Sequence, residues 1–257
     1  MSKESANGGS SHALEVRDLW VELDAGQGPR DVLRAIELEI GRGERVALMG
    51  RNGAGKSTLL RCIAGLVEPA RGSATAPGGV ALLAQSPSDY LVREKVADEL
   101  PGDAGLRALE AVGLEWALDS DPRDLSGGER QRLALAIVMA GRDAESAAPG
   151  LVCLDEPTRG MDRSRKDELA ARIEALARRG SAALVATHDV EFAATFADRV
   201  VLLGEGDVIA DDGRAEVLSG GWYFATEVAR ILPGSGAVTP AGGAAVLAAA
   251  RSVEAGA

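Results

Sequence analysis

Apolar runs of four or five residues alternate with helix-like repeats along most of the chain, from Leu14 to about Gly220. Residues 46–49 and 182–186 are continuous apolar runs, which is typical of strands buried on both faces of a sheet. Strands that alternate with helices in this way favour an α/β fold in which a mainly parallel sheet is flanked by helices.

The clearest helical repeat covers residues 162–179, where Leu169, Ile173 and Leu176 recur at three- and four-residue steps and a glycine follows as a stop signal. The densest apolar run, residues 133–140, is eight residues long and predicts a buried helix. A membrane-spanning helix needs about 18 consecutive apolar residues, so the sequence predicts none.

Two regions depart from the alternation of strands and helices. Residues 86–124 hold three prolines, several acidic residues and one short helical repeat, which predicts a helical insertion. With the helix that follows, it forms a helical subdomain at about 86–148 inside a main domain of residues 13–220. Residues 221–257 are rich in Gly, Ala and Pro and predict a C-terminal appendage, whose Ala-rich end, 243–251, forms a weak helix.

The composition narrows the classes of function. The chain has 257 residues, of which 46% are hydrophobic, and a formal net charge of −11. The negative charge argues against nucleic-acid binding, which depends on Lys and Arg to neutralise phosphates. Residues 1–12 are polar and predict a disordered tail, not a secretion signal. Cys62 and Cys153 lie in a predicted helix and strand and lack metal-ligand spacing, so we expect a soluble intracellular protein with both thiols reduced and buried.

A glycine-rich segment, GRNGAGKST, directly follows the apolar run 46–49. Its spacing fits the phosphate-binding pattern, in which backbone N–H groups and a helix N-terminus cradle phosphate groups. Lys56 is predicted to neutralise the outer phosphates, and the Ser57 hydroxyl to bind Mg²⁺. An ordinary glycine turn is the alternative, but the strand before the segment and the amphipathic helix after it favour nucleotide binding. The predicted nucleotide-binding residues, called the phosphate loop below, are Gly50, Arg51, Asn52, Gly53, Ala54, Gly55, Lys56, Ser57 and Thr58.

Two acidic residues, Asp155 and Glu156, follow the apolar run 151–154. Ligands of open parallel sheets bind at the carboxyl ends of the strands, so both side chains are expected at the binding edge. Asp155 is placed to hold Mg²⁺, directly or through water, and Glu156 to polarise a water for attack on the γ-phosphate. A solvated loop is the alternative, which the phosphate loop upstream disfavours.

Residues 125–132 read LSGGERQR and are called the signature segment below. Ser126 and two glycines predict a helix start whose free N–H groups can face an anion. Taken alone, the segment is better explained as a flexible helix cap. Beside the phosphate loop and the acidic pair, anion binding is favoured.

In this order along the chain, GRNGAGKST, Gln85, LSGGERQR, LVCLDEPT, RGMD and His188 resemble the ABC-type ATPases over roughly residues 14–215. The resemblance implies a P-loop NTPase core that binds ATP and Mg²⁺. It also implies that Gln85 links Mg²⁺ and the attacking water to the helical subdomain. By the same resemblance, Asp162 lies at a dimer seam and His188 contacts the γ-phosphate.

The mechanism of this family requires two such domains head to tail, as a homodimer or a heterodimer. Nucleotide held by Lys56 of one chain is then closed over by the signature residues of the other chain, which here are Ser126, Gly127, Gly128 and Glu129. The family usually stacks an aromatic residue near the end of the first strand on adenine. Leu23 stands there, which offers apolar contact without a π-face, and Trp20 lies out of register.

Finer features, such as QSPSDYLVREKVADEL (85–100) and LSGGWYFATEVARIL (218–232), resemble the ATPase subunits of energy-coupling-factor importers, and the tail resembles the second half of tandem-fused ATPases. These importers take up vitamins or transition-metal ions. The resemblance implies a peripheral protein at the cytoplasmic face of the cell membrane, with an integral membrane coupling protein and a membrane substrate-binding protein as partners. The acidic segment 86–99 suits a groove for a basic helix of the coupling protein, or is a solvated charged face.

Two other functions stay open. The chain could be the ATPase of a generic ABC importer, or a soluble ABC ATPase that acts on ribosomes or DNA. The short spacing between Lys56 and Ser126, the absence of a heptad run and the acidic charge disfavour the soluble type.

Overall fold

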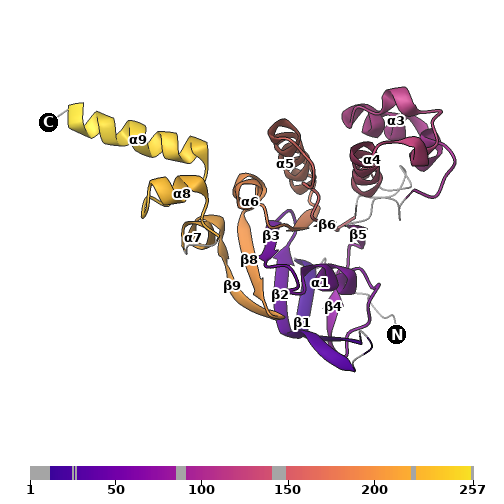
Figure 1. Ribbon diagram of the computed structural model, residues 1–257, viewed down its shortest axis with the longest axis horizontal. Helices are drawn as coiled ribbons and strands as arrows, with labels where there is room; N and C mark the ends of the chain where they lie inside the picture. The colour runs from indigo at the N-terminus through magenta and orange to yellow at the C-terminus, as the bar shows by residue number, and fades with distance from the viewer. Residues whose placement is uncertain are drawn as a thin grey trace, which may run out of the picture.

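The computed structural model describes residues 12–24, 26, 28–84, 91–140, 149–220 and 224–255, and their strands form two sheets (Figure 1). The larger sheet has six strands in the order β5-β6-β7-β3-β8-β9, and the smaller has three in the order β2-β1-β4. The larger contains β3 (Arg45–Gly50), β5 (Val80–Leu83), β6 (Leu151–Asp155), β7 (Ala182–Ala186), β8 (Arg199–Gly204) and β9 (Asp207–Gly213). The smaller contains β1 (His12–Asp24), β2 (Pro29–Gly41) and β4 (Arg71–Thr75).

The larger sheet is parallel from β5 to β8, and β9 pairs antiparallel with β8 at one edge. The helices of the main domain are α1 (Lys56–Ile63), α4 (Gly127–Ala140), α5 (Arg163–Arg178), α6 (Val190–Phe196) and α7 (Arg214–Ser219). The predicted α/β P-loop fold, with a mainly parallel sheet flanked by helices, is confirmed. Within the described residues, no helix combines the length and apolar character that crossing a bilayer requires.

The smaller sheet is a separate antiparallel layer that the prediction of a mainly parallel sheet from Leu14 onward did not distinguish. β1, β2 and β4 pair antiparallel, and His12 already belongs to β1, although residues 1–12 were expected to be disordered. Residues 1–11 lie outside the described part of the chain. The antiparallel pairing of the smaller sheet agrees with the pattern of β2, where Ile36, Leu38 and Ile40 are buried and the residues between them are exposed. A single buried face is typical of antiparallel sheets, whereas β3 is buried on both faces.

The core has two apolar layers because side chains of β3, a central strand, alternate between the two faces of the larger sheet. Val46 and Leu48 of β3 pack toward α1 and the smaller sheet, while Ala47 and Met49 pack toward α4, α5 and α6. Successive side chains of a strand point to opposite faces, so one buried strand serves two apolar layers. The loops at the carboxyl ends of these strands are therefore held on a rigid base.

The helical insertion has a separate apolar cluster. It contains α2 (Val96–Glu99), α3 (Gly102–Ala111), the 3₁₀ turns η2 (Glu115–Ala117) and η3 (Pro122–Asp124), and it packs on α4. Two details differ from expectation. Leu106, which with Leu109 and Val112 makes up the short helical repeat predicted within residues 86–124, is 38% exposed. Glu99, which lies in the acidic segment 86–99, is buried and accepts hydrogen bonds from the N–H groups of Val92 and Arg93. These elements lie within the predicted range of 86–148, and that boundary stays a prediction.

The C-terminal appendage consists of α8 (Glu227–Ile231) and α9 (Pro240–Ala255) in its described residues. It lies at the opposite end of the molecule from α3 and α4, and α9 extends away from the sheet (Figure 1). α9 begins before the predicted residue 243 because Thr239 caps it: its hydroxyl accepts from the Gly242 N–H at 3.2 Å, and Pro240 is pre-organised for a first turn. The helix also continues past the predicted end at 251, to Ala255.

Candidate nucleotide-binding site

The phosphate loop connects the carboxyl end of β3 to α1, and two of its glycines are required by space. At Gly50 (φ +147°) an added Cβ would lie 2.3 Å from the carbonyl oxygen of Leu203. At Gly55 (φ +103°) it would lie 2.6 Å from the Leu33 side chain. Both backbone conformations are ones that L side chains rarely adopt, so the sequence uses glycine where the loop turns tightly against the sheet.

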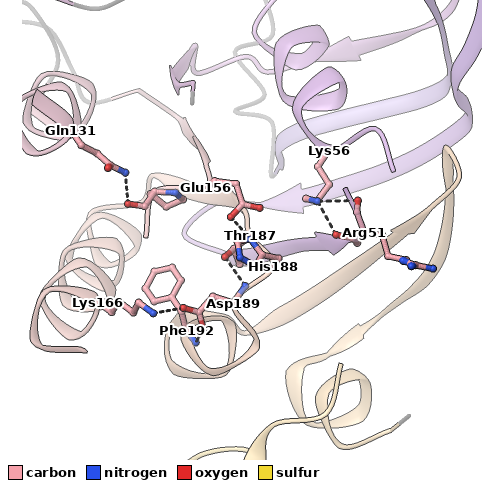
Figure 2. A network of polar contacts seen from close by, with 11 residues as sticks. Arg51, Lys56, Gln131, Glu156, Lys166, Thr187, His188, Asp189 and Phe192 are labelled. Atoms are coloured by element: carbon pink, nitrogen blue, oxygen red, sulfur yellow. Dashed lines mark hydrogen bonds and ion pairs between the residues drawn. The ribbon is translucent and has the colours of Figure 1, made fainter. Parts of the chain in front are cut away.

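Lys56, the first residue of α1, holds the loop together. Its ammonium is buried and donates to the carbonyl oxygens of Gly50 at 2.8 Å and Arg51 at 3.3 Å (Figure 2). No side chain caps the N-terminus of α1, which begins after Gly55. The free N–H groups of the first turn and the buried cation together form a site for an anion.

A cleft joins this loop to the end of β6. The residues that line it are Val32, Asn52, Gly53, Gly55, Lys56, Ser57, Thr58, Asp155 and Glu156. The structure therefore brings most of the predicted phosphate loop together with the predicted acidic pair. Gln85, predicted to act as both a metal ligand and a catalytic residue, lies outside the described residues.

Asp155 is buried at the end of β6, and its Oδ1 atom has no hydrogen-bond partner among the described residues. Burial raises the pKa of this carboxyl, while a hydrogen bond from Ser57 and the charges of Arg61 and Lys56 act in the opposite direction. A buried oxygen without a partner costs free energy unless something binds it. The described residues contain no group of three or more His, Cys, Asp or Glu side chains placed to hold a metal. A site of one carboxylate and one hydroxyl fits Mg²⁺, which commonly completes its shell with water and substrate phosphates.

Glu156 and His188 come together at the same edge. His188 Nδ1 lies 2.8 Å from Glu156 Oε2, and the side chain of Glu156 is 11% exposed whereas that of His188 is 71% exposed (Figure 2). An ionised carboxylate only accepts hydrogen bonds, so Nδ1 of His188 is the donor when Glu156 is charged. The backbone of Glu156 has φ +50°, in the left-handed region, and its N–H donates to the carbonyl of Ala186 at 2.9 Å. The neighbouring strand β7 therefore fixes an unfavourable backbone conformation that aims this carboxylate into the cleft.

The signature segment starts α4 with a reciprocal cap. The Ser126 N–H donates to Glu129 Oε2 at 2.7 Å, and the Glu129 N–H donates to the Ser126 hydroxyl at 3.4 Å. Hydrogen bonds to the Glu129 carboxyl from the side chain and the backbone N–H of Ser126 lower its pKa. A second cleft is lined by Asn52, Gly127, Gly128, Gln131, Glu156, Arg159, Gly160 and His188. The glycines of the signature segment thus face the space beside the Glu156–His188 pair.

Three further residues bear on the site and were assigned no role from the sequence. Gln131 on α4 donates its side-chain amide to the carbonyl of Pro157 at 2.7 Å, directly after Glu156. Lys166 on α5 pairs with Asp189, directly after His188. Asp189 could have been predicted as a helix cap from its position directly before an apolar helical segment, and its carboxylate does cap α6. The other two contacts join residues 26 and 23 positions apart, which no local pattern reveals.

For two other predicted positions, Asp162 and Leu23, the structure gives the contacts and the exposure of the side chain. Asp162 caps α5 by accepting from the Arg165 N–H at 3.0 Å, and its side chain is 66% exposed. Leu23 is 43% exposed near the end of β1. The indole of Trp20 donates to Asp18 at 2.9 Å. The roles of Asp162 at a seam and of Leu23 near adenine stay predictions.

Comparison with known proteins identifies the family. The family model described as "ABC transporter" matches residues 33–159. The hemin import ATP-binding protein HmuV of Plesiomonas shigelloides is 37% identical over 75% of this chain and 87% of its own length. The energy-coupling factor transporter ATP-binding protein EcfA of Methanothermobacter thermautotrophicus is 33% identical over 79% and 72%. An ABC transporter ATP-binding protein of Streptomyces coelicolor is 44% identical, and the chain spans 43% of that relative's length.

Solved structures agree with these relatives. The structure of cbiO1 from Clostridium perfringens, part of the ABC transporter complex cbiONQ, superposes with a TM-score of 0.64 at 27% identity, over 80% of this chain and 90% of that one. The ATP-binding cassette MJ0796, in a dimeric structure with ADP and Pi, has the same fold, with a TM-score of 0.69 at 23% identity over 81% of this chain and 100% of that one. The chain therefore belongs to the ABC transporter family and is one of its ATP-binding domains.

Proposed function

We propose that the chain is the ATP-binding and hydrolysing subunit that powers a membrane importer. The observation that carries the proposal is the Glu156–His188 pair, 2.8 Å apart at the edge of the cleft that the phosphate loop and Asp155 line. This cleft offers a buried cation, a helix N-terminus and a buried carboxylate, which suit a nucleoside triphosphate.

The chemistry follows from the positions of these groups. Lys56 exchanges its two carbonyl partners for oxygens of the outer phosphates. Asp155 and the Ser57 hydroxyl would hold Mg²⁺, which neutralises charge on the β- and γ-phosphates. Glu156 orients a water and accepts its proton as the water oxygen attacks the γ-phosphorus and the bond to the leaving ADP breaks. His188, held by Glu156 through Nδ1, contacts the γ-phosphate.

The glycines of the signature segment support a site completed by a second ATPase domain. Apart from its chain neighbours and the nearby backbone of α4, a Cβ added at Gly127 or Gly128 would meet no described atom within 4 Å, and neither residue has a positive φ. Glycine inside a helix costs about 1 kcal/mol relative to alanine. Neither packing within the chain nor backbone conformation therefore requires these glycines, whereas close approach of a nucleotide on a partner domain does. We assign Ser126, Gly127, Gly128 and Glu129 to contacts made in trans, and Asp162 to the seam.

We place the chain among the energy-coupling-factor importers, as a peripheral protein at the cytoplasmic face of the membrane. EcfA and cbiO1, both among the similar proteins, support this class, and the resemblance of residues 218–232 points the same way. Its partners are then a second ABC ATPase, an integral membrane coupling protein and a membrane substrate-binding protein, and its cargo is a vitamin or a transition-metal ion. HmuV, a hemin import protein, keeps a generic ABC importer as the second candidate.

A pair of variants tests the proposed chemistry. Glu156→Gln keeps the size and the hydrogen-bonding capacity of the side chain but removes the base, so turnover should fall by at least about 100-fold while ATP still binds. Lys56→Ala should instead weaken ATP binding, by roughly 10- to 100-fold, because a charged hydrogen-bond donor to phosphate is lost. Turnover is measured as phosphate release, and binding as fluorescence of an ATP analogue. Hydrolysis at the wild-type rate by Glu156→Gln removes that residue from the role.

A further inference from the structure

An ion pair connects α5, the helix that follows Asp155 and Glu156 along the chain, to the residue after His188, beyond the carboxyl end of β7. Lys166 lies in the first turns of α5, and its ammonium is 2.6 Å from Asp189 Oδ2 (Figure 2). The two side chains are 32% and 18% exposed, so the pair is largely shielded from water. Lys166 therefore links α5 to the residue directly after His188.

Asp189 is held from several sides. Its Oδ1 accepts from the Phe192 N–H at 3.0 Å, and its own N–H donates to the Thr187 hydroxyl at 3.0 Å, with Thr187 fully buried. Burial alone would raise the pKa of Asp189, but the hydrogen bonds from Lys166 and Phe192 bring it below its usual value. The flanking residues are therefore fixed, while the His188 ring itself is 71% exposed. The position of that ring depends on its anchored neighbours and on Glu156.

The other end of the ion pair leads back to Glu156. The Lys166 N–H donates to the carbonyl of Asp162 at 3.1 Å, and the turn before Asp162 is closed by bonds from Met161 to Thr158 (3.0 Å) and from Arg159 to Glu156 (3.4 Å). The contacts form a closed ring that runs from Glu156 through this turn and α5 to Lys166, then through Asp189 and His188 back to Glu156. Removing the Lys166 charge opens the ring at a point outside the two clefts, since neither Lys166 nor Asp189 is among their lining residues.

We propose that Lys166 is a positioning residue for hydrolysis, which acts through Asp189 to keep His188 against Glu156. The inference rests on the proposed function of the Glu156–His188 pair. The competing explanation is that the ion pair stabilises only the packing of α5 on α6. The two explanations differ in whether His188 responds when Lys166 is changed.

The kinetic test compares two charge deletions on α5. Lys166→Met keeps the length of the side chain and removes the charge, and it should lower kcat by about 10- to 100-fold with little change in ATP affinity, since small displacements of a reacting group cost this much. Lys166→Arg should recover most of the activity. Arg178→Met breaks an exposed ion pair with Glu174 on the same helix and should leave kcat unchanged. An unchanged kcat in Lys166→Met would overturn the proposal.

A second kinetic arm separates positioning from general damage. In a His188→Ala background, measured in single turnovers, adding Lys166→Met should lower the rate no further, because residues that act through one group are not additive. An equal loss in both backgrounds would assign Lys166 to packing alone. If His188→Ala and Glu156→Gln both hydrolyse ATP like the wild type, the proposed function fails, which is a different result from failure of the Lys166 variant alone.

Nuclear magnetic resonance provides a readout that does not depend on activity. The chain contains two histidines, His12 and His188, so each imidazole can be assigned from the other's absence in a variant. Lys166→Met should shift the ring resonances of His188 and leave those of His12 unmoved. Arg178→Met should move neither. Identical His188 resonances in Lys166→Met and wild type would show that the ring does not depend on the ion pair.

Discussion

Both cysteines lie at buried positions where the thiol reacts slowly. Cys153 lies in the middle of β6 with no exposed surface, and burial raises the pKa of its thiol far above the ordinary value. Cys62 lies on the inner face of α1, and burial raises the pKa of its thiol as well. The thiolate is the reactive form, so both are protected twice, by burial and by protonation.

We predict that neither cysteine reacts with iodoacetamide in the native protein at pH 8, and that both react once the protein is unfolded in urea. Mass spectrometry of the labelled chain counts the modified thiols, and the denatured sample is the control. Rapid labelling of Cys153 under native conditions would contradict its place in the sheet.

At the scale of single residues, the sequence predicted which side chains meet at the site, but not the residues that contact and support them. Asp155, Glu156 and His188 each follow an apolar strand, and parallel strands end at one edge, so their convergence was predictable. Their roles stay predictions. Lys166 and Gln131 could not be singled out, because each meets its partner through tertiary packing and not through spacing along the chain.

The elements show where local patterns suffice. α5 begins and ends within one residue of its predicted limits, because an Asp cap and a stop glycine bracket a clear apolar repeat. The smaller sheet was missed as a separate layer, although the alternation in β2 was a signal for it. Strand pairing itself depends on distant parts of the chain, and no local rule supplies it.

The reciprocal cap at the start of α4 gives a prediction at this scale. Ser126→Ala removes the hydroxyl that accepts from the Glu129 N–H, and the free energy of unfolding should fall by about 1 kcal/mol. Ser126→Asn, which can still cap the helix, should lose far less. Urea unfolding followed by circular dichroism measures both variants. Equal stability of the Ala and Asn variants would mean that the 3.4 Å contact does not stabilise the helix.

For the whole molecule, the proposed assembly in trans makes binding and closure separable. Ser126→Arg should leave ATP binding by the single chain intact, because its own phosphate loop is untouched, and should abolish ATP-dependent dimer formation by filling the place of the partner's phosphate. The assay is size-exclusion chromatography in a Glu156→Gln background, with the second ATPase added if the dimer is heteromeric.

Ser219→Arg is the matched control for this experiment. Ser219 is exposed at the end of α7, on the side of the molecule that carries the appendage (Figure 1), so the same added bulk and charge should leave dimer formation unchanged. A loss of ATP binding in Ser126→Arg as large as its loss of dimer formation would argue against a site shared between two chains.

The left-handed backbone of Glu156 sets a further expectation for the stability of the whole fold. A non-glycine residue at φ +50° is disfavoured by about 1 kcal/mol relative to glycine. Glu156→Gly should therefore unfold at a higher temperature than Glu156→Ala, which keeps the Cβ atom but also lacks the carboxylate. Differential scanning calorimetry compares the two. A lower melting temperature for the glycine variant would show that the turn at this position is not strained.

This strain has a consequence for directed evolution of the protein. Among variants that have lost Glu156, a library screened only for heat resistance rewards glycine over alanine, because relief of the backbone is measurable and the loss of hydrolysis is invisible to such a screen. Heat-selected variants would then accumulate as well-folded nucleotide binders without turnover. A screen that seeks a thermostable working form has to hold position 156 constant and find its gains elsewhere, for example along the exposed face of α9.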